Sequence, residues 1–223
     1  MLSQINPEIQ RCSDTRVAYV ADIPGIVRTH QESFPDFFLT RLGPWFLHEY
    51  YRLVLEASGG ILWVAMRDEH VVGFVAGFVD TVRFYETMRA KKWRLAFPVL
   101  MRLLVYPRMI KRVLMNFRHV NHDGDQDKLH PGTAAELSSI GVDPNYAGRG
   151  IGKQLVADFL REAGRRDAAY VKLTTDAHNN ASVNSFYDNL GFRLVNTFAQ
   201  ADGRVMNAYM LPLSAVEKEL SYV

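Results

Sequence analysis

The feature that most restricts the fold of this chain is a glycine-rich turn between a strand-like run and an amphipathic helix. The run at 135–142 ends before Asp143, and the sequence AGRGIG follows at 147–152. Apolar residues then recur at helical spacing from Ile151 to Phe159. Glycines let backbone N–H groups approach an anion, and the N-terminus of a helix favours negative charge. The segment therefore predicts a strand, a pyrophosphate cradle and a helix in succession.

Two better-known phosphate loops do not fit this turn. Its glycines fall at alternate positions, Gly148, Gly150 and Gly152, which is not the G-x-G-x-x-G spacing of dinucleotide-binding proteins. A P-loop is excluded because Lys153 does not follow the four-residue gap between glycines that the motif requires. The turn alone therefore leaves two interpretations open, a purely structural turn and an anion site.

The rest of the chain alternates between strand-like and helix-like runs, which indicates an α/β fold with a mixed sheet. Besides the run at 135–142, strands are predicted at 17–20, 61–66, 71–79, 169–174, 192–198 and 204–211. Helices are predicted from Asp22 to a break at Phe34-Pro35, and at 44–57, 150–164 and 181–190. Since neither a repeat nor a linker interrupts this order, residues 1–223 are predicted to form a single domain.

Charge is distributed unevenly along the chain. The net charge is only +2, but the segment 82–118 has ten basic residues against one acid, Glu86, so it carries +9 and the remainder carries −7. The segment is predicted to form helices broken near Pro98 and Pro107, and a polar loop follows at 119–133. Three roles stay open for it: contact with an anionic membrane surface, an electropositive wall for a phosphate-bearing acceptor, or a solvated helical face docked on the domain or on a second subunit.

Composition and short motifs argue against several other classes of protein. The chain is 48% hydrophobic and 22% charged, as globular proteins are, and its single cysteine, Cys12, cannot form an internal disulfide. The first ten residues lack the features of a signal peptide, and no run of about 18 uncharged apolar residues is present. The Asp-rich stretch from Asp123 has Lys128 and Ala134 where a calcium loop needs glycine and glutamate. We therefore expect a cytoplasmic protein without a metal site, with peripheral membrane contact left open.

Two blocks of the sequence together resemble the GNAT superfamily of acyl-CoA-dependent N-acetyltransferases. The block at 140–152 resembles the acyl-CoA-binding motif of that superfamily, and Asn180, Phe186-Tyr187 and the run at 190–192 resemble its downstream motif at the usual separation. Ala147 departs from the pattern, which usually has Gln or Arg there, so weaker cofactor binding is expected. The resemblance implies a mixed, mostly antiparallel central sheet with helices on both faces. The basic helical segment would be an insertion between the third strand and the cofactor-binding strand.

The resemblance also implies an activity. It is the transfer of an acetyl group from acetyl-CoA, as cosubstrate, to a primary amine by direct attack on the thioester. A small molecule, such as an amino sugar, is the expected acceptor, and nucleic acid is not expected as a partner. A protein or peptide N-acetyltransferase stays open, as does a non-catalytic acyl-CoA-binding module that docks on a membrane or a partner. A homodimer also stays open.

Cofactor-binding roles follow from the resemblance residue by residue. The backbone of Ile140 and Val142 would hold pantetheine, and the Val142 N–H would polarise the thioester carbonyl. The pyrophosphate would be held by the backbone amides of Arg149, Gly150, Gly152 and Lys153. Asn180 would contact the cofactor from the far side. Tyr187 would lie near the sulfur and protonate the leaving thiolate, or else it is an amphipathic tyrosine packed beside Phe186.

The acceptor side is less clearly marked. Glu136 is the candidate general base, because the strand pleat is expected to place it on one face with Ser138 and Ile140, opposite Leu137, Ser139 and Gly141. A solvent-facing carboxylate is an equally open interpretation. The aromatic side chains of Phe34, Phe37 and Phe38 could stack on an acceptor, and core packing is the alternative for all three.

Overall fold

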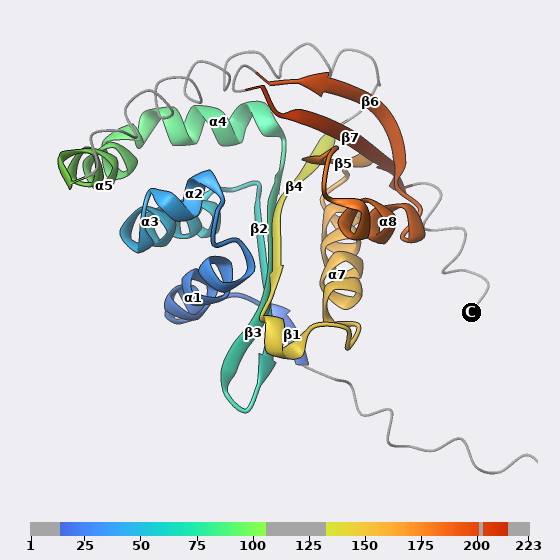
Figure 1. Cartoon of the computed structure of the whole chain (residues 1–223), viewed down its shortest axis with the longest axis horizontal. Coiled ribbons are helices and arrows are strands. Elements are labelled where there is room, and N and C mark those ends of the chain that lie inside the picture. The colour runs from blue at the N-terminus through green and yellow to red at the C-terminus, as the bar shows by residue number, and fades with distance from the viewer. Residues whose placement is uncertain (1–13, 106–132, 201–202, 214–223) are drawn as a thin grey trace, which may run out of the picture.

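The computed structural model describes residues 14–105, 133–200 and 203–213, and within them it contains one seven-stranded sheet (Figure 1). Its order is β1-β2-β3-β4-β5-β7-β6, and only the β4–β5 pair is parallel. The strands are β1 (Asp14–Val17), β2 (Gly60–Arg67), β3 (His70–Val79), β4 (Ala134–Val142), β5 (Tyr170–Asp176), β6 (Arg193–Ala199) and β7 (Val205–Pro212). The predicted mixed, mostly antiparallel sheet is confirmed.

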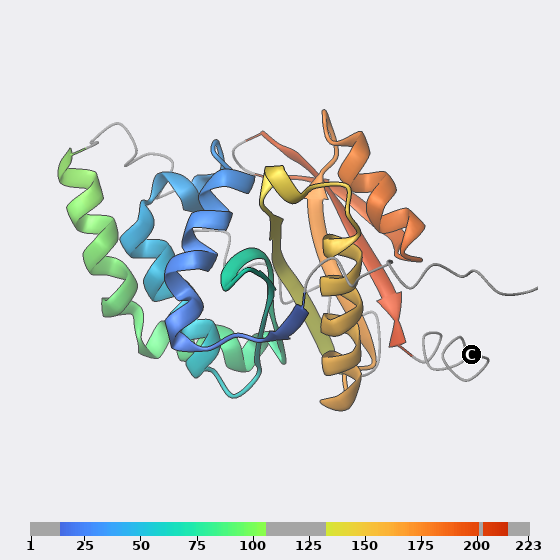
Figure 2. The same cartoon turned by 90° about the horizontal axis from the view of Figure 1, so that it is seen from below.

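Helices cover both faces of this sheet, as Figure 2 shows from below. One face carries α1 (Ile23–Ser33), α2 (Phe38–Arg41), α3 (Pro44–Glu56), α4 (Thr81–Ala90) and α5 (Lys92–Val105). The other carries α7 (Ile151–Arg165) and α8 (Ala181–Asn189), and short 3-10 turns lie at Val20–Asp22 and Pro144–Tyr146. Each face has its own buried cluster, one around Tyr51 and Phe74 and the other around Leu155 and Phe159.

The first strand lies three residues before its predicted position. The sequence predicts a strand at 17–20, whereas β1 ends at Val17 and a 3-10 turn begins at Val20. Asp22 causes the difference, because its carboxylate accepts a hydrogen bond from the Tyr19 amide (2.7 Å) and pairs with both terminal nitrogens of Arg16 (2.7 and 2.8 Å). The exposed Val17 and Val20 were therefore misleading as signals of a buried strand.

The basic segment is helical where the structure describes it, but its break lies elsewhere than predicted. The chain bends at Lys91, between α4 and α5, and α5 continues through Pro98. Packing of Leu95 and Val99 in the cluster that includes α3 compensates for the backbone hydrogen bond that a proline removes. The break predicted near Pro107, and residues 119–132 of the polar loop, lie outside the described residues.

The two strands at the centre of the sheet, β4 and β5, separate after a short paired stretch. Contact between β4 and β5 is limited to Ala134–Glu136 against Tyr170–Lys172, whereas β4 pairs with β3 along nearly its whole length. From Leu137 onward the edge of β4 that faces β5 is therefore uncovered by that strand. Beyond Glu136 and Lys172 the two strands are therefore splayed.

A β-bulge in β4 makes the observed alternation of side chains differ from the predicted one. Leu137 pairs with Gly77 and Ser139 with Ala76, so Ser138 is an extra residue without a partner. Leu137 and Ile140 consequently pack against the same cluster, and Ser138 contacts the opposite one through a hydrogen bond to Tyr50. The expectation that Glu136, Ser138 and Ile140 share a face holds for Glu136 and Ser138, which both lie toward Tyr50. It is wrong for Ile140, because one inserted residue reverses the alternation beyond it.

Candidate functional site

The turn between β4 and α7 presents a row of backbone donors. Asp143 starts the turn by accepting a hydrogen bond from the Asn145 amide (2.8 Å), and positive φ angles at Gly148 (74°) and Gly150 (80°) complete it. The first amide bonded within α7 is that of Gln154, which donates to Gly150 O (3.0 Å). In the described part of the chain, none of the amides from 148 to 153 has an acceptor. They lie at the positive end of a 15-residue helix, an arrangement that suits an anion, and we call this turn the cradle.

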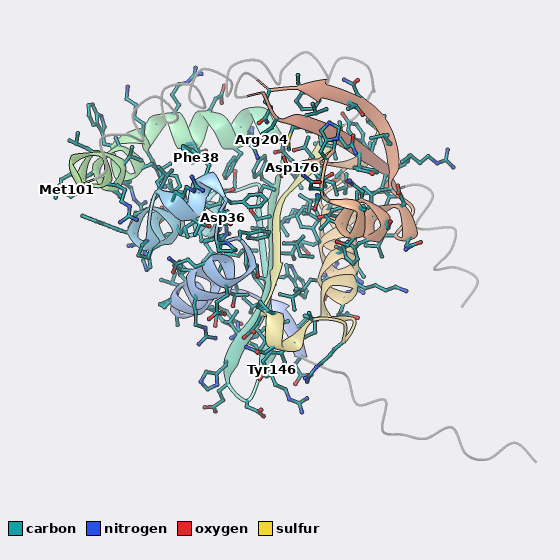
Figure 3. All side chains as sticks on the ribbon, in the orientation of Figure 1. Asp36, Phe38, Met101, Tyr146, Asp176 and Arg204 are labelled. Carbon is teal, nitrogen blue, oxygen red and sulfur yellow. The ribbon has the colours of Figure 1, made fainter. Side chains whose placement is uncertain are left out.

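The space around this cradle is open enough for a ligand. A Cβ built on Gly148 or Gly150 meets nothing within 4 Å, so these glycines serve the backbone conformation and the access of a ligand to the amides. The guanidinium of Arg149 lies 5.2 Å from the ring centroid of Tyr146 and donates to Asn145 O (3.2 Å). Tyr146, labelled in Figure 3, holds this cation beside the cradle. The exposed Lys153 supplies a second positive charge.

The uncovered edge of β4 leads directly into the cradle. The Asp143 amide donates to Val72 O on β3 (2.9 Å), and backbone groups alternate in direction along a strand. The N–H groups of Val142 and Ile140 therefore point to the opposite edge, where β5 is no longer paired. Ser33 of α1 donates to Val142 O (3.1 Å) and fixes the end of the strand. The structure thus brings the predicted pantetheine and pyrophosphate residues into one continuous surface.

Tyr187 lies under this surface with its ring buried. Its ring is 5.2 Å from Phe186, 5.5 Å from Phe192 and 6.2 Å from Tyr209, measured between centroids. Burial raises the pKa of Tyr187 well above its ordinary value, so the phenol is protonated at neutral pH. Among the described residues its hydroxyl has no hydrogen-bond partner. Such a group can donate a hydrogen bond to a developing thiolate, while complete proton transfer from it is uphill.

Asn180 begins α8 on the far side of the splay. Its carbonyl accepts the first helical bond from Asn184 N (3.0 Å), while its side chain makes no capping hydrogen bond. The Asn184 side chain ties the helix to β5 by donating to Asp176 O (3.2 Å). The helix is therefore anchored by Asn184, and the Asn180 amide is not used for capping.

Glu136 lies where β4 and β5 separate, on the α1–α3 face of the sheet. Its carboxylate is 4.0 Å from Lys172 Nζ on the paired residue of β5, and both side chains are mostly buried. Burial, and to a smaller degree the Glu136 charge, raise the pKa of Tyr50 to about 12, while its hydrogen bond with Ser138 opposes them. Glu136 is thus a carboxylate within a partly buried polar network rather than a solvent-facing side chain.

A polar seam along β4 was not predicted from the sequence. Tyr50 Oη lies 3.1 Å from Ser138 Oγ, which donates to Ala76 O (3.1 Å), so these two side chains brace the bulge. Next to them, His30 Nδ1 is 2.6 Å from Tyr51 Oη. The two tyrosines have helical spacing typical of core residues, and only the polar Ser138-Ser139 pair in an otherwise apolar strand could have indicated the seam.

His30 is buried with only half of its imidazole satisfied. Nε2 is the one fully buried side-chain nitrogen or oxygen in the described residues that lacks a hydrogen-bond partner. Three aromatic rings, of Phe34, Tyr51 and Phe74, surround the imidazole at 5.0–6.0 Å between centroids. Burial lowers the pKa of His30 to about 4, so the ring is neutral at physiological pH.

The three candidate acceptor phenylalanines do not form one platform. Phe34 and Phe38 are partly buried against the α1–α3 cluster, which favours their interpretation as core residues. Phe37 is 48% exposed, with its ring 5.1 Å from that of Phe34. Phe37 is therefore the only one of the three whose ring is largely exposed.

Comparisons with known proteins relate this chain to acetyltransferases. The sequence model of the acetyltransferase (GNAT) family matches residues 113–192. The solved structures of Arabidopsis thaliana NAA60 (TM-score 0.57, 17% identity) and of the ribosomal-protein-S18-alanine N-acetyltransferase of Escherichia coli (TM-score 0.54, 16% identity) share the fold. Each match covers 90% of this chain, with 98% of the NAA60 chain and 94% of the other. The chain therefore contains a region that matches the GNAT family model, within a fold that solved N-acetyltransferases share.

Curated relatives match over a shorter stretch. Mycothiol acetyltransferase of Kocuria rhizophila is 34% identical over 70 residues, and N-alpha-acetyltransferase RimI of Mycobacterium tuberculosis is 40% identical over 60 residues. These matches cover 29% and 27% of this chain, and only 23% and 35% of the respective relatives. The similarity therefore concerns a part of each relative.

Proposed function

We propose that the chain is an acetyl-CoA-dependent N-acetyltransferase whose acceptor is the primary amine of a small molecule, with an amino sugar as the first candidate. One observation carries the proposal: the amides from 148 to 153 have no acceptor among the described residues and adjoin the edge of β4 that β5 leaves uncovered. Together they suit a ligand with a pyrophosphate at one end and an amide-bearing arm that pairs with a strand edge. Ala147 lacks a polar side chain, so the backbone, Arg149 and Lys153 hold the phosphates.

The cofactor residues keep the roles given by the resemblance. When bound, acetyl-CoA supplies the activated thioester carbonyl. The amides of Arg149, Gly150, Gly152 and Lys153 would hold its pyrophosphate, the edge of β4 at Ile140 and Val142 its pantetheine, and Asn180 its far side. The Val142 N–H would stabilise negative charge on the carbonyl oxygen as the acceptor nitrogen bonds to the carbonyl carbon.

Two proton movements complete the proposed reaction. An alkylammonium must lose a proton before it can attack, and the Glu136 carboxylate, directly or through a water molecule, would take it. As the carbon–sulfur bond breaks, the Tyr187 hydroxyl would donate a hydrogen bond to the leaving sulfur. The CoA thiolate takes up, through solvent, the second proton that the acylated nitrogen releases, and the amide product leaves.

The acceptor class rests on weaker support than the cofactor does. Two of the curated relatives are named mycothiol acetyltransferase, which favours a small molecule. The similarity to RimI favours a protein N-terminus as the second candidate. The cytoplasm stays the proposed compartment, and among the described residues no helix is long and apolar enough to cross a bilayer.

The first experiment tests the cradle with a matched pair of glycine variants. Gly150 and Gly203 both have positive φ (80° and 85°) and open space where a Cβ would lie, but only Gly150 belongs to the cradle. Both Gly150→Ala and Gly203→Ala should destabilise the protein by about 1 kcal/mol because alanine disfavours this conformation. Isothermal titration should show acetyl-CoA binding to the wild type and to Gly203→Ala, and at least tenfold weaker binding to Gly150→Ala. Equal affinity in all three proteins would contradict the proposal that the cradle binds acetyl-CoA.

The second experiment measures CoA release with a panel of amino sugars, other small amines and N-terminal peptides. Faster CoA release with a small amine would support a small-molecule acceptor. Faster release with peptides would support a protein N-terminus instead. Tyr187→Phe should lower kcat about 100-fold and leave acetyl-CoA binding unchanged, as expected when a hydrogen-bond donor to the developing thiolate is lost. Full turnover in that variant would remove Tyr187 from the mechanism. Binding without release for any amine would leave a non-catalytic acyl-CoA module.

A further inference from the structure

The outer side of α5 is apolar although it faces solvent. Trp93, Phe97, Leu100 and Met101 are 75%, 51%, 57% and 44% exposed, and their spacing places them on one stripe of the helix. The opposite side of α5 is also apolar, but it is buried in the α1–α3 cluster. In Figure 3 the label of Met101 lies at the outer margin of the molecule, away from the sheet. The outer stripe is not needed to hold α5 in place, because the opposite side of the helix is already buried. An exposed apolar stripe of this kind is typical of an interaction site.

The stripe continues onto α3 and into a shallow groove. The ring of Trp45, which is 51% exposed, lies 5.1 Å from that of Phe97 in an edge-on contact. Behind Trp45, a cavity of about 490 Å³ opens between α1 and α3, with Pro24, Val27 and Pro44 on its walls. We call the five side chains Trp45, Trp93, Phe97, Leu100 and Met101 the α5 patch.

The helix that carries the α5 patch is also rich in cations. The sequence has no acidic residue between Glu86 and Asp123, and the described part of this stretch contains five cations, Arg89, Lys91, Lys92, Arg94 and Arg102. Lys91 and Arg94 turn toward Glu56 of α3 (2.9 and 2.7 Å). Lys92 and Arg89 are exposed, and Lys92 Nζ lies 5.6 Å from the ring of Trp93. A tryptophan and a lysine side by side at the rim of an aliphatic stripe are typical of helices that lie in a membrane interface.

We propose that the α5 patch docks the protein on the surface of an anionic lipid bilayer. Trp93, Phe97, Leu100 and Met101 would enter the boundary between head groups and acyl chains, and Lys92 would lie at the level of the lipid phosphates. This inference is independent of the proposed acetyl transfer, since it uses no residue of the cradle or of the polar seam.

Charge and side-chain type favour lipid over two other occupants. In a symmetric dimer through α5, the patch would face its own copy, so the cations at its rim would meet like charges. A nucleic acid would offer phosphates to the cations, but it has no partner for the exposed aliphatic side chains of Leu100 and Met101. A bilayer with anionic head groups complements both parts of the surface.

Co-sedimentation with lipid vesicles tests the proposal on the full chain. We expect the wild type to sediment with phosphatidylcholine vesicles that contain one quarter phosphatidylglycerol, and at least tenfold less with pure phosphatidylcholine or in 0.5 M NaCl. Phe97→Glu and Leu100→Glu should each lower the partition coefficient at least tenfold. The matched control is Leu194→Glu on the edge strand β6, which is 52% exposed and far from α5 in the chain, and it should bind as the wild type does.

Three results would overturn the proposal. The first is a wild type that binds neither kind of vesicle. The second is binding that Phe97→Glu and Leu100→Glu leave unchanged, since the lipid contact would then lie elsewhere on the chain. The third is light scattering that shows a wild-type dimer and a Phe97→Glu monomer, neither of which binds lipid, because a second copy would then cover the patch. Unfolding midpoints and acetyl-CoA binding of each variant show that a loss of sedimentation is not a loss of fold.

Discussion

The two faces of the sheet are built from different kinds of group. Under α7 and α8 the buried cluster is almost wholly hydrocarbon, and its functional groups are backbone amides at its margin. Under α1 and α3 the cluster includes Tyr50 and Tyr51, whose hydroxyls contact Ser138 Oγ and His30 Nδ1, while the buried His30 Nε2 has no partner among the described residues. A site made of backbone needs only a rigid apolar support, whereas a site made of side chains brings polar atoms into the core. The α7–α8 side is therefore expected to be stable and insensitive to pH, and the α1–α3 side is expected to titrate.

The largest effect is expected on the apolar face. Phe159 is fully buried, and its ring would be 2.7 Å from a Cβ added at Gly77, so β3 and α7 leave no room between them. Phe159→Ala should lower the free energy of unfolding by about 3–5 kcal/mol, in equal measure at pH 7.5 and pH 5. Urea titrations at both pH values measure this. A loss that changes by more than about 1 kcal/mol between them would show that the apolar face is coupled to a titrating group.

The polar face should lose stability in acid through His30. Its pKa is about 4 in the folded protein and 6.5 as a free side chain, so the unfolded state binds more protons between these values. The free energy of unfolding should therefore fall by about 3 kcal/mol as the pH drops from 7 to below 4, and the loss begins near pH 6.5.

The variant His30→Phe isolates this contribution. Other groups also lose stability in acid, notably Glu56, whose pKa is lowered to about 2 by Arg94 and then Lys91, but that loss begins only below pH 4.5. Between pH 6.5 and 4.5 the free energy of unfolding, measured with urea, should fall more steeply with decreasing pH in the wild type than in His30→Phe. Parallel slopes would mean that the imidazole is solvated in the native state.

The same difference explains what could be predicted from the sequence. A backbone site needs glycine where φ is positive, as at Gly148 and Gly150, and that requirement leaves a recognisable motif within a few positions. The glycine-rich turn and the following helix were predicted for this reason. The seam joins the side chains of Tyr50 and Ser138, which are 88 positions apart in the chain, and no local sequence pattern predicts such a contact.

Errors in the prediction arose where tertiary contacts override local patterns. A single extra residue at Ser138 reversed the pleat of β4, and alternation cannot show this because each half of the strand alternates correctly by itself. Pro98 was expected to end a helix, but packing of its neighbours carries the helix through it. The carboxylate of Asp22 displaced the first strand through contacts to Arg16 and Tyr19. Helix and strand types were thus predictable, whereas register and side-chain pairing were not.

A smaller effect is expected from removal of one hydroxyl of the seam. Tyr50→Phe removes the hydrogen bond to Ser138 that braces the bulge, and Ser138 keeps its bond to Ala76 O. The free energy of unfolding should fall by about 1 kcal/mol. Tyr187→Phe is the matched control, because its hydroxyl has no partner among the described residues and its loss should change stability by less than about 0.5 kcal/mol. Equal losses in the two variants would contradict a bracing role for Tyr50.

The smallest effect concerns the ion pairs that hold α5 against α3. Glu56 is paired with Lys91 Nζ (2.9 Å) and with Arg94 Nη1 (2.7 Å) at the surface, where each pair contributes little. Glu56→Gln should lower the free energy of unfolding by about 0.5–1 kcal/mol at pH 7, and by less in 1 M NaCl because salt screens exposed charges. Its contribution should be complete above pH 4.5 and vanish as the pH approaches 2, since pairing depresses the carboxyl pKa in the folded state. A loss above about 2 kcal/mol at pH 7 would instead make these ion pairs, rather than the buried Leu95 and Val99, the main support of α5.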